Sequence, residues 1–213
     1  MTSEHILQII KLLKDEYPNS KTSLIYSNPL ELLIATLLSA QCTDKKVNEV
    51  TRNLFPKYRK VQDYANVDNK KLESDIKSTG FYKKKAKYLK QSCKMIIDTF
   101  NSKVPNTMND LLQLPGVARK TANIVLSNAY GIVQGIAVDT HVKRLTQRLN
   151  LTQNKNPEKI ERDLMKIIPR EEWPAINSLL IDHGRKICTA KKPKCLICML
   201  RDLCPSFSKI SQE

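Results

Sequence analysis

The sequence predicts an all-α fold. Glycine is scarce, with five in 213 residues, and no segment alternates apolar and polar residues over enough positions to suggest a sheet. Apolar residues recur instead at helical spacing, as at Ile6, Ile9, Ile10 and Leu13 and along the segment 30–38. Together these observations favour helices joined by short loops.

Several helix boundaries follow from capping residues. Asn28, followed by Pro29, predicts a helix start, because asparagine is a favoured N-cap and proline fits the first helical position. Thr107 and Asn156 predict two further starts. Gly131 predicts the end of a helix that begins near residue 119, because glycine tolerates the left-handed backbone that terminates many helices.

The charge balance of the chain is strongly basic. Lysine and arginine number 36 against 21 aspartate and glutamate residues, which gives a formal net charge of +15 and a pI near 9.6. Such a chain is attracted to polyanions, so nucleic acid is the expected partner, with a basic protein of other function as the alternative. An anionic membrane is a weaker candidate, because no helix rich in lysine and arginine carries a strongly apolar opposite face.

No targeting or membrane-spanning segment is recognisable. The most apolar stretch, residues 30–40, carries Glu31 and is too short to cross a bilayer, and the N-terminal residues show no signal-peptide cleavage site. We therefore expect the protein to work in the cytoplasm, at the nucleoid if the source is prokaryotic.

Four of the six cysteines gather near the C-terminus in the pattern C-x6-C-x2-C-x5-C: Cys188, Cys195, Cys198 and Cys204. In a reducing compartment such a cluster indicates a metal site more often than disulfides. Four thiolates can surround one Zn²⁺ or hold a [4Fe–4S] cluster, and spacing alone does not separate the two.

The loop between the first two of these cysteines is basic, because it contains Lys191, Lys192 and Lys194. A metal that fixes a short basic loop would create a rigid contact to a phosphate, which positions a protein on DNA without reading its sequence. The alternative is a solvated face of charges.

A second pattern, from Leu114 to Leu126, predicts a helix–hairpin–helix. Proline and Gly116 indicate a tight turn, and the following helix, expected from Arg119 to Tyr130, would point its first N–H groups at a phosphate. Gly116 would let a phosphodiester come close. The alternative is an ordinary corner between two packed helices.

Two residues are candidates for catalysis. Lys120 lies in the first turn of the expected helix beside Arg119, where the helix dipole and the neighbouring charge both favour a neutral amine, as a nucleophilic lysine requires. The alternative is a surface lysine. Asp139 precedes another helix, where it is expected as an N-cap and could also serve as a functional carboxylate.

These motifs resemble the endonuclease III family over nearly the whole chain. The matching segments are Glu31–Ala35, Leu38–Gln41 with Thr43 and Asp44, Gly80–Tyr82, the hairpin, Val138–His141, His183–Arg185 and the four cysteines. The resemblance implies a base-excision repair enzyme, a DNA glycosylase and AP lyase, with a [4Fe–4S] cluster rather than zinc. Its implied partner is double-stranded DNA that contains damaged pyrimidines or abasic sites, and the protein would act as a monomer.

The resemblance also implies residue roles and a domain arrangement. Lys120 would be the nucleophile, Asp139 its carboxylate partner, and Gln41 and the Phe81 loop would fill the duplex where a base has been flipped out. Two helical domains would flank a DNA-binding cleft. A six-helix bundle with the hairpin would span residues 23–134, and a cluster domain would combine residues 1–22 and 135–213.

One position departs from the family. Hairpins of the family often carry a second glycine where this chain has Ala118, which would be strained if the backbone there had a positive φ and harmless if the residue begins the helix. We expect the second case, with Gly116, Ala118 and Arg119 facing the phosphate.

Three alternatives stay open at this point. Adenine- and thymine-mismatch glycosylases resemble this chain but usually lack a lysine at position 120. A DNA-binding module without activity would need only the charge and the hairpin, and a structural protein held by zinc would need only the cysteines.

Overall fold

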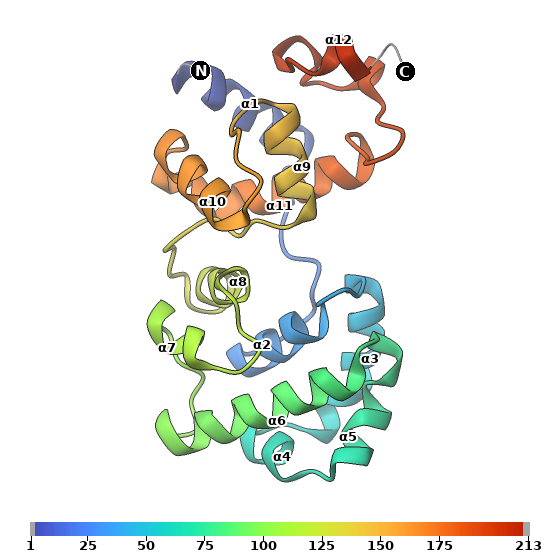
Figure 1. Ribbon diagram of the computed structural model, residues 1–213, viewed down its shortest axis with the longest axis vertical. Coiled ribbons are helices and arrows are strands. Elements are labelled where there is room, and N and C mark those ends of the chain that lie inside the picture. The colour runs from blue at the N-terminus through green and yellow to red at the C-terminus, as the bar shows by residue number, and fades with distance from the viewer. Residues whose placement is uncertain (1–2, 211–213) are drawn as a thin grey trace. The chain divides into compact units, whose positions relative to one another are not determined.

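A computed structural model describes residues 3–210 (Figure 1). Within this range the regular structure consists of α-helices and short 3-10 helices, with no strand, which confirms the all-α prediction. The chain divides into two compact units. Unit 1 combines residues 1–22 with 135–213, and unit 2 is the continuous segment 23–134. In the part of the chain that the structure describes, no helix combines the length and the apolar character needed to cross a membrane.

Unit 2, described at every residue, contains seven α-helices and one 3-10 helix. They are α2 (Pro29–Leu38), α3 (Asp44–Lys57), α4 (Val61–Asn66), α5 (Asn69–Asp75), η1 (Lys77–Thr79), α6 (Tyr82–Thr99), α7 (Met108–Gln113) and α8 (Arg119–Tyr130). The expected bundle had six helices, and the structure has seven α-helices and one 3-10 helix in the same segment. The predicted bounds of α8 are confirmed.

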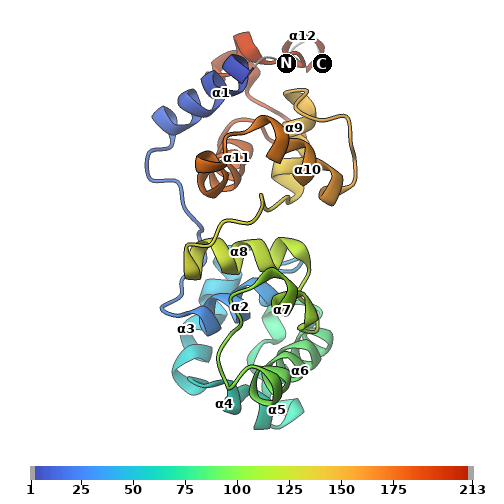
Figure 2. The ribbon, with the colours of Figure 1, turned by 90° about the vertical axis from the view of Figure 1, so that its left-hand side faces the viewer.

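The core of unit 2 forms around α2, which lies between α8 and α6 (Figures 1 and 2). Residues 32–38 of α2 are all buried, so this helix is covered on every side rather than along one stripe. Its start is fixed locally, because the Asn28 side chain accepts a hydrogen bond from the Glu31 N–H at 3.0 Å. The predicted cap at this position is thereby confirmed.

Unit 1 has its own core. Its helices are α1 (Ser3–Glu16), α9 (Thr140–Arg148), α10 (Pro157–Ile167), η2 (Arg170–Glu172), α11 (Trp173–Lys186), η3 (Cys195–Ile197), η4 (Arg201–Leu203) and α12 (Phe207–Ile210). Helix α11 packs against both α1 and α9. The apolar stripe of α1, with Ile6, Ile9, Ile10 and Leu13, is buried in this core, so the two ends of the chain share one unit.

The turn between α7 and α8 is a type II β-turn. The Val117 N–H donates to the Leu114 carbonyl oxygen at 3.0 Å, with proline second and Gly116 third in the turn. Gly116 has φ +83°, the left-handed value that the third position requires. Leu114 and Val117 are buried, and the Ser92 hydroxyl donates to the Pro115 carbonyl at 2.8 Å, so α6 holds the turn in place.

Glycine is needed at position 116 for a second reason, which is space. A Cβ atom there would lie 2.6 Å from Cδ2 and 2.8 Å from Cγ of Tyr88. Gly131, which ends α8, shares the left-handed backbone with φ +66°, but a Cβ atom at that position meets nothing within 4 Å. A substitution of Gly131 therefore tests backbone strain alone, whereas a substitution of Gly116 tests backbone strain together with steric overlap.

We predict that Gly116→Ala destabilises the protein more than Gly131→Ala. Each substitution places alanine in a left-handed conformation, at about 1–2 kcal/mol, and only Gly116→Ala adds overlap with Tyr88, at a further cost of about 1–3 kcal/mol. Urea unfolding followed by circular dichroism measures both. Equal losses of stability in the two variants would show that the Tyr88 ring moves aside freely.

Candidate functional site

The N-terminus of α8 has no side-chain cap. The N-cap residue is Ala118, whose side chain can accept no hydrogen bond, so the first N–H groups of the helix lack the partner that a serine or aspartate would supply. Ala118 has φ −96° and ψ 169°, an extended backbone that any residue adopts. The departure from the family pattern at this position therefore causes no strain.

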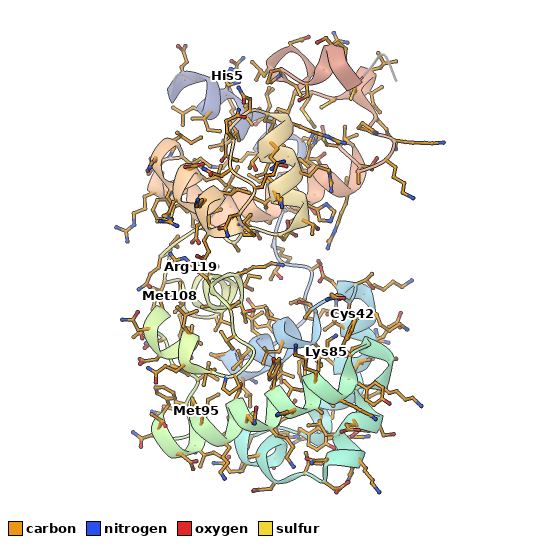
Figure 3. All side chains as sticks on the ribbon, viewed as in Figure 1. His5, Cys42, Lys85, Met95, Met108 and Arg119 are labelled. Carbon is orange, nitrogen blue, oxygen red and sulfur yellow. The ribbon has the colours of Figure 1, made fainter. Side chains whose placement is uncertain are left out.

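Lys120 and Arg119 occupy the first turn of α8. Lys120 is exposed together with Gly116 and Ala118, whereas Arg119, which Figure 3 labels at this end of α8, is half-buried. Exposed N–H groups at a helix start attract anions, and an exposed amine beside them can reach an anion bound there. This end of α8 therefore combines a phosphate-binding geometry with a potential nucleophile.

Asp139 is the N-cap of α9, as predicted from the sequence. Its Oδ1 accepts a hydrogen bond from the Val142 N–H at 2.8 Å, and the residue is half-buried. Among the described residues no hydrogen bond reaches the other carboxylate oxygen, Oδ2. One carboxylate oxygen therefore caps the helix, and the second oxygen can still accept a hydrogen bond or a proton from another group.

Helix α9 is held against α11 by His141 and Arg144. The Arg144 guanidinium lies 3.2 Å from Nδ1 of His141 and donates to the Gly184 carbonyl at 3.0 Å. A Cβ atom at position 184 would lie 2.8 Å from Nδ1 of His141, so glycine in α11 lets the two helices approach. Burial lowers the pKa of His141, which favours its neutral form in this structural role.

The cysteine segment begins where α11 ends and is joined to α9 by arginines. Arg148 donates to Sγ of Cys188 at 3.2 Å and to the carbonyls of Thr189 at 2.7 Å and Ala190 at 3.1 Å. Arg144 adds a bond to the Cys188 carbonyl at 2.9 Å. The helix that Asp139 caps is therefore attached at its other end to the first cysteine.

The four cysteines fit an iron–sulfur cluster as donors. All four are free and half-buried, and three of them pack against the apolar core of unit 1. Burial is the main cause that raises the pKa of Cys198 to about 11, and the charges of Cys188, Cys204 and Cys195 contribute to the same rise, which places these cysteines near Cys198. A [4Fe–4S] cube offers a separate iron to each of four thiolates, so the number and type of these donors fit such a cluster.

The three lysines of this segment, Lys191, Lys192 and Lys194, are all exposed. Their backbone is nevertheless ordered by local hydrogen bonds. The Lys194 N–H donates to the Ile187 carbonyl at 3.0 Å, and the Thr189 hydroxyl donates to the Lys192 carbonyl at 2.6 Å. The result is a fixed basic loop with its charges in solvent.

Gln41 and Phe81 lie at the ends of helical elements in unit 2. Gln41 follows α2 with φ +52°, and Phe81 is the N-cap of α6 with φ +47°. Both are exposed, and Phe81 keeps 64% of its surface in solvent, which is unusual for a large apolar side chain in an otherwise well-packed unit. Lys85 connects the helical elements that precede the two residues, because its ammonium donates to the carbonyls of Leu38 and Thr79.

Reasoning from the sequence missed Lys85 and the two arginines of α9. Lys85 follows Lys83 and Lys84, so the run suggests a solvated face. A signal was nevertheless present, because Lys85 shares its helical phase with Leu89 and Ile96, both fully buried. The arginines gave no comparable signal, because their partners are backbone carbonyls some 40 positions away in the chain.

The chain matches two protein-family models. Residues 34–170 match the HhH-GPD superfamily of base excision DNA repair proteins, and residues 188–204 match the iron–sulfur binding domain of endonuclease III. The second match begins and ends at the first and last of the four clustered cysteines. It decides between the two metals that the spacing left open, in favour of an iron–sulfur cluster.

Known relatives cover nearly all of the chain. Endonuclease III of Synechocystis sp. is 51% identical over 199 residues, which are 93% of this chain and 91% of the relative. A non-covalent complex of endonuclease III with DNA superposes with a TM-score of 0.96 at 43% identity, covering 100% of both chains. A trapped covalent intermediate of endonuclease III with DNA gives a TM-score of 0.94 at 44% identity, covering 98% of each chain.

These likenesses resolve the alternatives of a DNA-binding module without activity and of a structural zinc protein. The chain belongs to the endonuclease III family of the helix-hairpin-helix superfamily, base-excision repair enzymes that are DNA glycosylases with AP lyase activity and contain a [4Fe–4S] cluster.

Proposed function

We propose that this chain acts as a monomer on duplex DNA, removes oxidised pyrimidines and cleaves the strand at the resulting abasic site. The observation that carries the proposal is the exposed Lys120 in the first turn of α8, a helix whose N-terminus no side chain caps. N–H groups at a helix start suit a backbone phosphate, and the net charge of +15 supports capture of DNA. The endonuclease III complexes with DNA, which share this fold, support the same assignment.

The chemistry assigned to Lys120 is nucleophilic. With the damaged base flipped out of the duplex, Nζ attacks C1′ of the deoxyribose, the N-glycosidic bond breaks, and the base leaves with a proton. Opening of the sugar ring gives a Schiff base between Nζ and C1′. Loss of a proton from C2′ then breaks the C3′–O bond, and the strand is cut on the 3′ side of the lesion.

Asp139 is the proposed carboxylate partner of this step. Oδ1 is engaged by the Val142 N–H, and Oδ2 is the atom we assign to the reaction. A carboxylate there can take a proton from the Lys120 ammonium or stabilise the positive charge that develops on the sugar. The hydrogen bond to Val142 fixes the direction of the side chain for either role.

In unit 1 we assign the cluster to four ligands: Cys188, Cys195, Cys198 and Cys204. The cluster would fix the fold of a segment that otherwise contains only short 3-10 helices, and its role in this proposal is structural. Unit 1 is then the cluster domain and unit 2 the hairpin domain. The exposed lysines of the cluster segment would contact phosphates and add to affinity without selecting a sequence.

Gln41 and Phe81 are assigned to the duplex itself. When a base leaves the stack, its place has to be filled or the helix closes again. An exposed aromatic side chain at a fixed turn suits that space, and a glutamine can hydrogen-bond the base left without a partner.

We predict that Lys120→Ala abolishes the covalent complex that borohydride traps between the protein and abasic DNA, because no Schiff base forms without the Nζ nucleophile. Binding to DNA should change little, since one charge among many is removed. Lys70→Ala is the matched control, because Lys70 is also exposed in unit 2. On a duplex with an oxidised pyrimidine, Asp139→Asn should slow base release severely, while its melting temperature should stay near wild type because asparagine caps a helix about as well as aspartate.

Two outcomes would contradict these assignments. Trapping that persists in Lys120→Ala, at another amine, would remove Lys120 from the chemistry. Full turnover in a stable Asp139→Asn protein would leave capping as the only role of that residue.

Cysteine substitutions test the cluster ligands directly. Cys198→Ser should lose bound iron, acid-labile sulfide and the brown absorbance, because a serine hydroxyl replaces the thiolate that a cluster iron needs. Cys42→Ser removes a cysteine outside the cluster segment and should keep all three properties. Metal and sulfide analysis of anaerobically purified protein gives the answer, and an unchanged iron content in Cys198→Ser would reject this ligand.

Replacing Lys191, Lys192 and Lys194 together by alanine should weaken binding to any duplex. The dependence of log K on log salt should flatten by up to about 2.7, at about 0.9 for each phosphate that a lysine no longer neutralises. The control removes three exposed lysines from another part of unit 1: Lys155, Lys159 and Lys166. Equal slopes in the two triple variants would mean that the cluster loop makes no special contact.

A further inference from the structure

Lys85 is a buried cation in unit 2 without an acidic partner among the described residues. Only 5% of its surface is exposed, and none of the ion pairs in that part of the chain includes it. Its ammonium group instead donates to two backbone carbonyls, those of Leu38 and Thr79, each at 2.7 Å. Burial lowers the pKa of Lys85, so these two bonds have to offset an unfavourable environment for the charge.

The two acceptors are the last residues of helical elements. Leu38 ends α2 and Thr79 ends η1, and carbonyls at helix ends lack partners within the helix and carry the negative end of its dipole. The last turn of α2 contains no basic residue of its own. Lys85 belongs to a different helix, α6, and its positive charge stabilises the C-terminal end of α2.

The segments that follow these two carbonyls carry Gln41 and Phe81. Gln41 comes three positions after Leu38, and Phe81 comes two positions after Thr79. Both have left-handed backbones, with φ +52° and φ +47°, although neither is glycine. Such conformations cost about 1–3 kcal/mol and persist only where the surrounding structure fixes them.

Lys85 also holds Phe81 through its main chain. Its N–H donates to the Phe81 carbonyl at 3.0 Å, as the first turn of α6 forms. Lys85 is therefore hydrogen-bonded to the chain just before Phe81, to Phe81 itself and to the end of the helix that precedes Gln41. Cys42, which follows Gln41, lies near the Lys85 ammonium (Figure 3).

We propose that Lys85 is a positioning residue that joins the Gln41 turn and the Phe81 turn into one rigid pair, so that both side chains enter the duplex in a fixed relation. This inference rests on the proposed role of Gln41 and Phe81 in the duplex. A lysine present only to fill space would be replaceable by methionine, which has a similar length and no charge to bury. If the proposal holds, the carbonyls of Leu38 and Thr79 lose their donor in Lys85→Met, and the two turns move independently.

The test uses Lys85→Met and Lys85→Gln, with Lys83→Met as the control that removes an exposed charge two positions away in the same helix. Hydrogen exchange is measured first, without DNA. Amides of residues 39–42 and 79–82 should exchange about tenfold faster or more in Lys85→Met, because both turns lose a buried anchor, and faster by a smaller factor in Lys85→Gln. Lys83→Met should exchange like wild type. Exchange that rises at neither turn, or at only one, overturns the inference.

The second measurement compares two substrates under single-turnover conditions: a duplex with an oxidised pyrimidine, and a duplex with a ready-made abasic site. Lys85→Met should slow the first reaction about tenfold or more relative to the second, because misplaced side chains impair flipping rather than strand cleavage. Lys85→Gln keeps one or both hydrogen bonds without the charge, so its effect should be smaller. If Lys85→Met fails to fold, Lys85→Gln carries both measurements.

The double variant Gln41→Ala/Phe81→Ala separates this inference from the function on which it rests. Adding Lys85→Met to that background should leave the ratio of the two rates unchanged, because nothing is left to position. If the double variant itself keeps the wild-type ratio, the proposed role of Gln41 and Phe81 fails. If the double variant changes the ratio and Lys85→Met keeps it, that role stands and the inference about Lys85 is overturned.

Discussion

Backbone N–H and C=O groups at helix ends have to find partners outside the helix, and in this chain several of the candidate site residues lie at such ends. The start of α9 is satisfied by Asp139 through one carboxylate oxygen, and the end of α2 by Lys85 from a different helix. The start of α8 receives no hydrogen bond from its N-cap side chain, because its N-cap is alanine. Arg148 ties the far end of α9 to Cys188, and Ser92 holds the turn before α8. Because small displacements of a reacting atom reduce rates strongly, residues that fix helix ends can affect the proposed chemistry without taking part in it.

The features that the sequence predicted well depend on local rules. Asn28 and Asp139 bond to N–H groups three positions away, so a short segment contains both partners. The bounds of α8 were predictable because Gly116 and Gly131 mark the turn before it and its end. The family resemblance, carried by motifs along the whole chain, supplied the cluster type that cysteine spacing left undecided.

The features that the sequence did not predict depend on contacts between distant segments. The left-handed backbones at Gln41 and Phe81 have no local cause, since neither residue favours that region. Lys85 bonds to a carbonyl 47 positions away, and no rule of spacing identifies such a partner. The steric need for glycine at position 116 has the same origin, because the atoms that leave no room for a Cβ belong to Tyr88.

Unit 1 combines both ends of the chain, which has a consequence for synthesis on the ribosome. Chains emerge with the N-terminus first, so α1 is complete long before α11, the helix it packs against. Throughout that interval the apolar stripe of α1, with Ile6 and Ile9, has no native partner, while every residue of unit 2 is already available to fold. The nascent chain therefore exposes the apolar face of α1 until the last third of the protein has been synthesised.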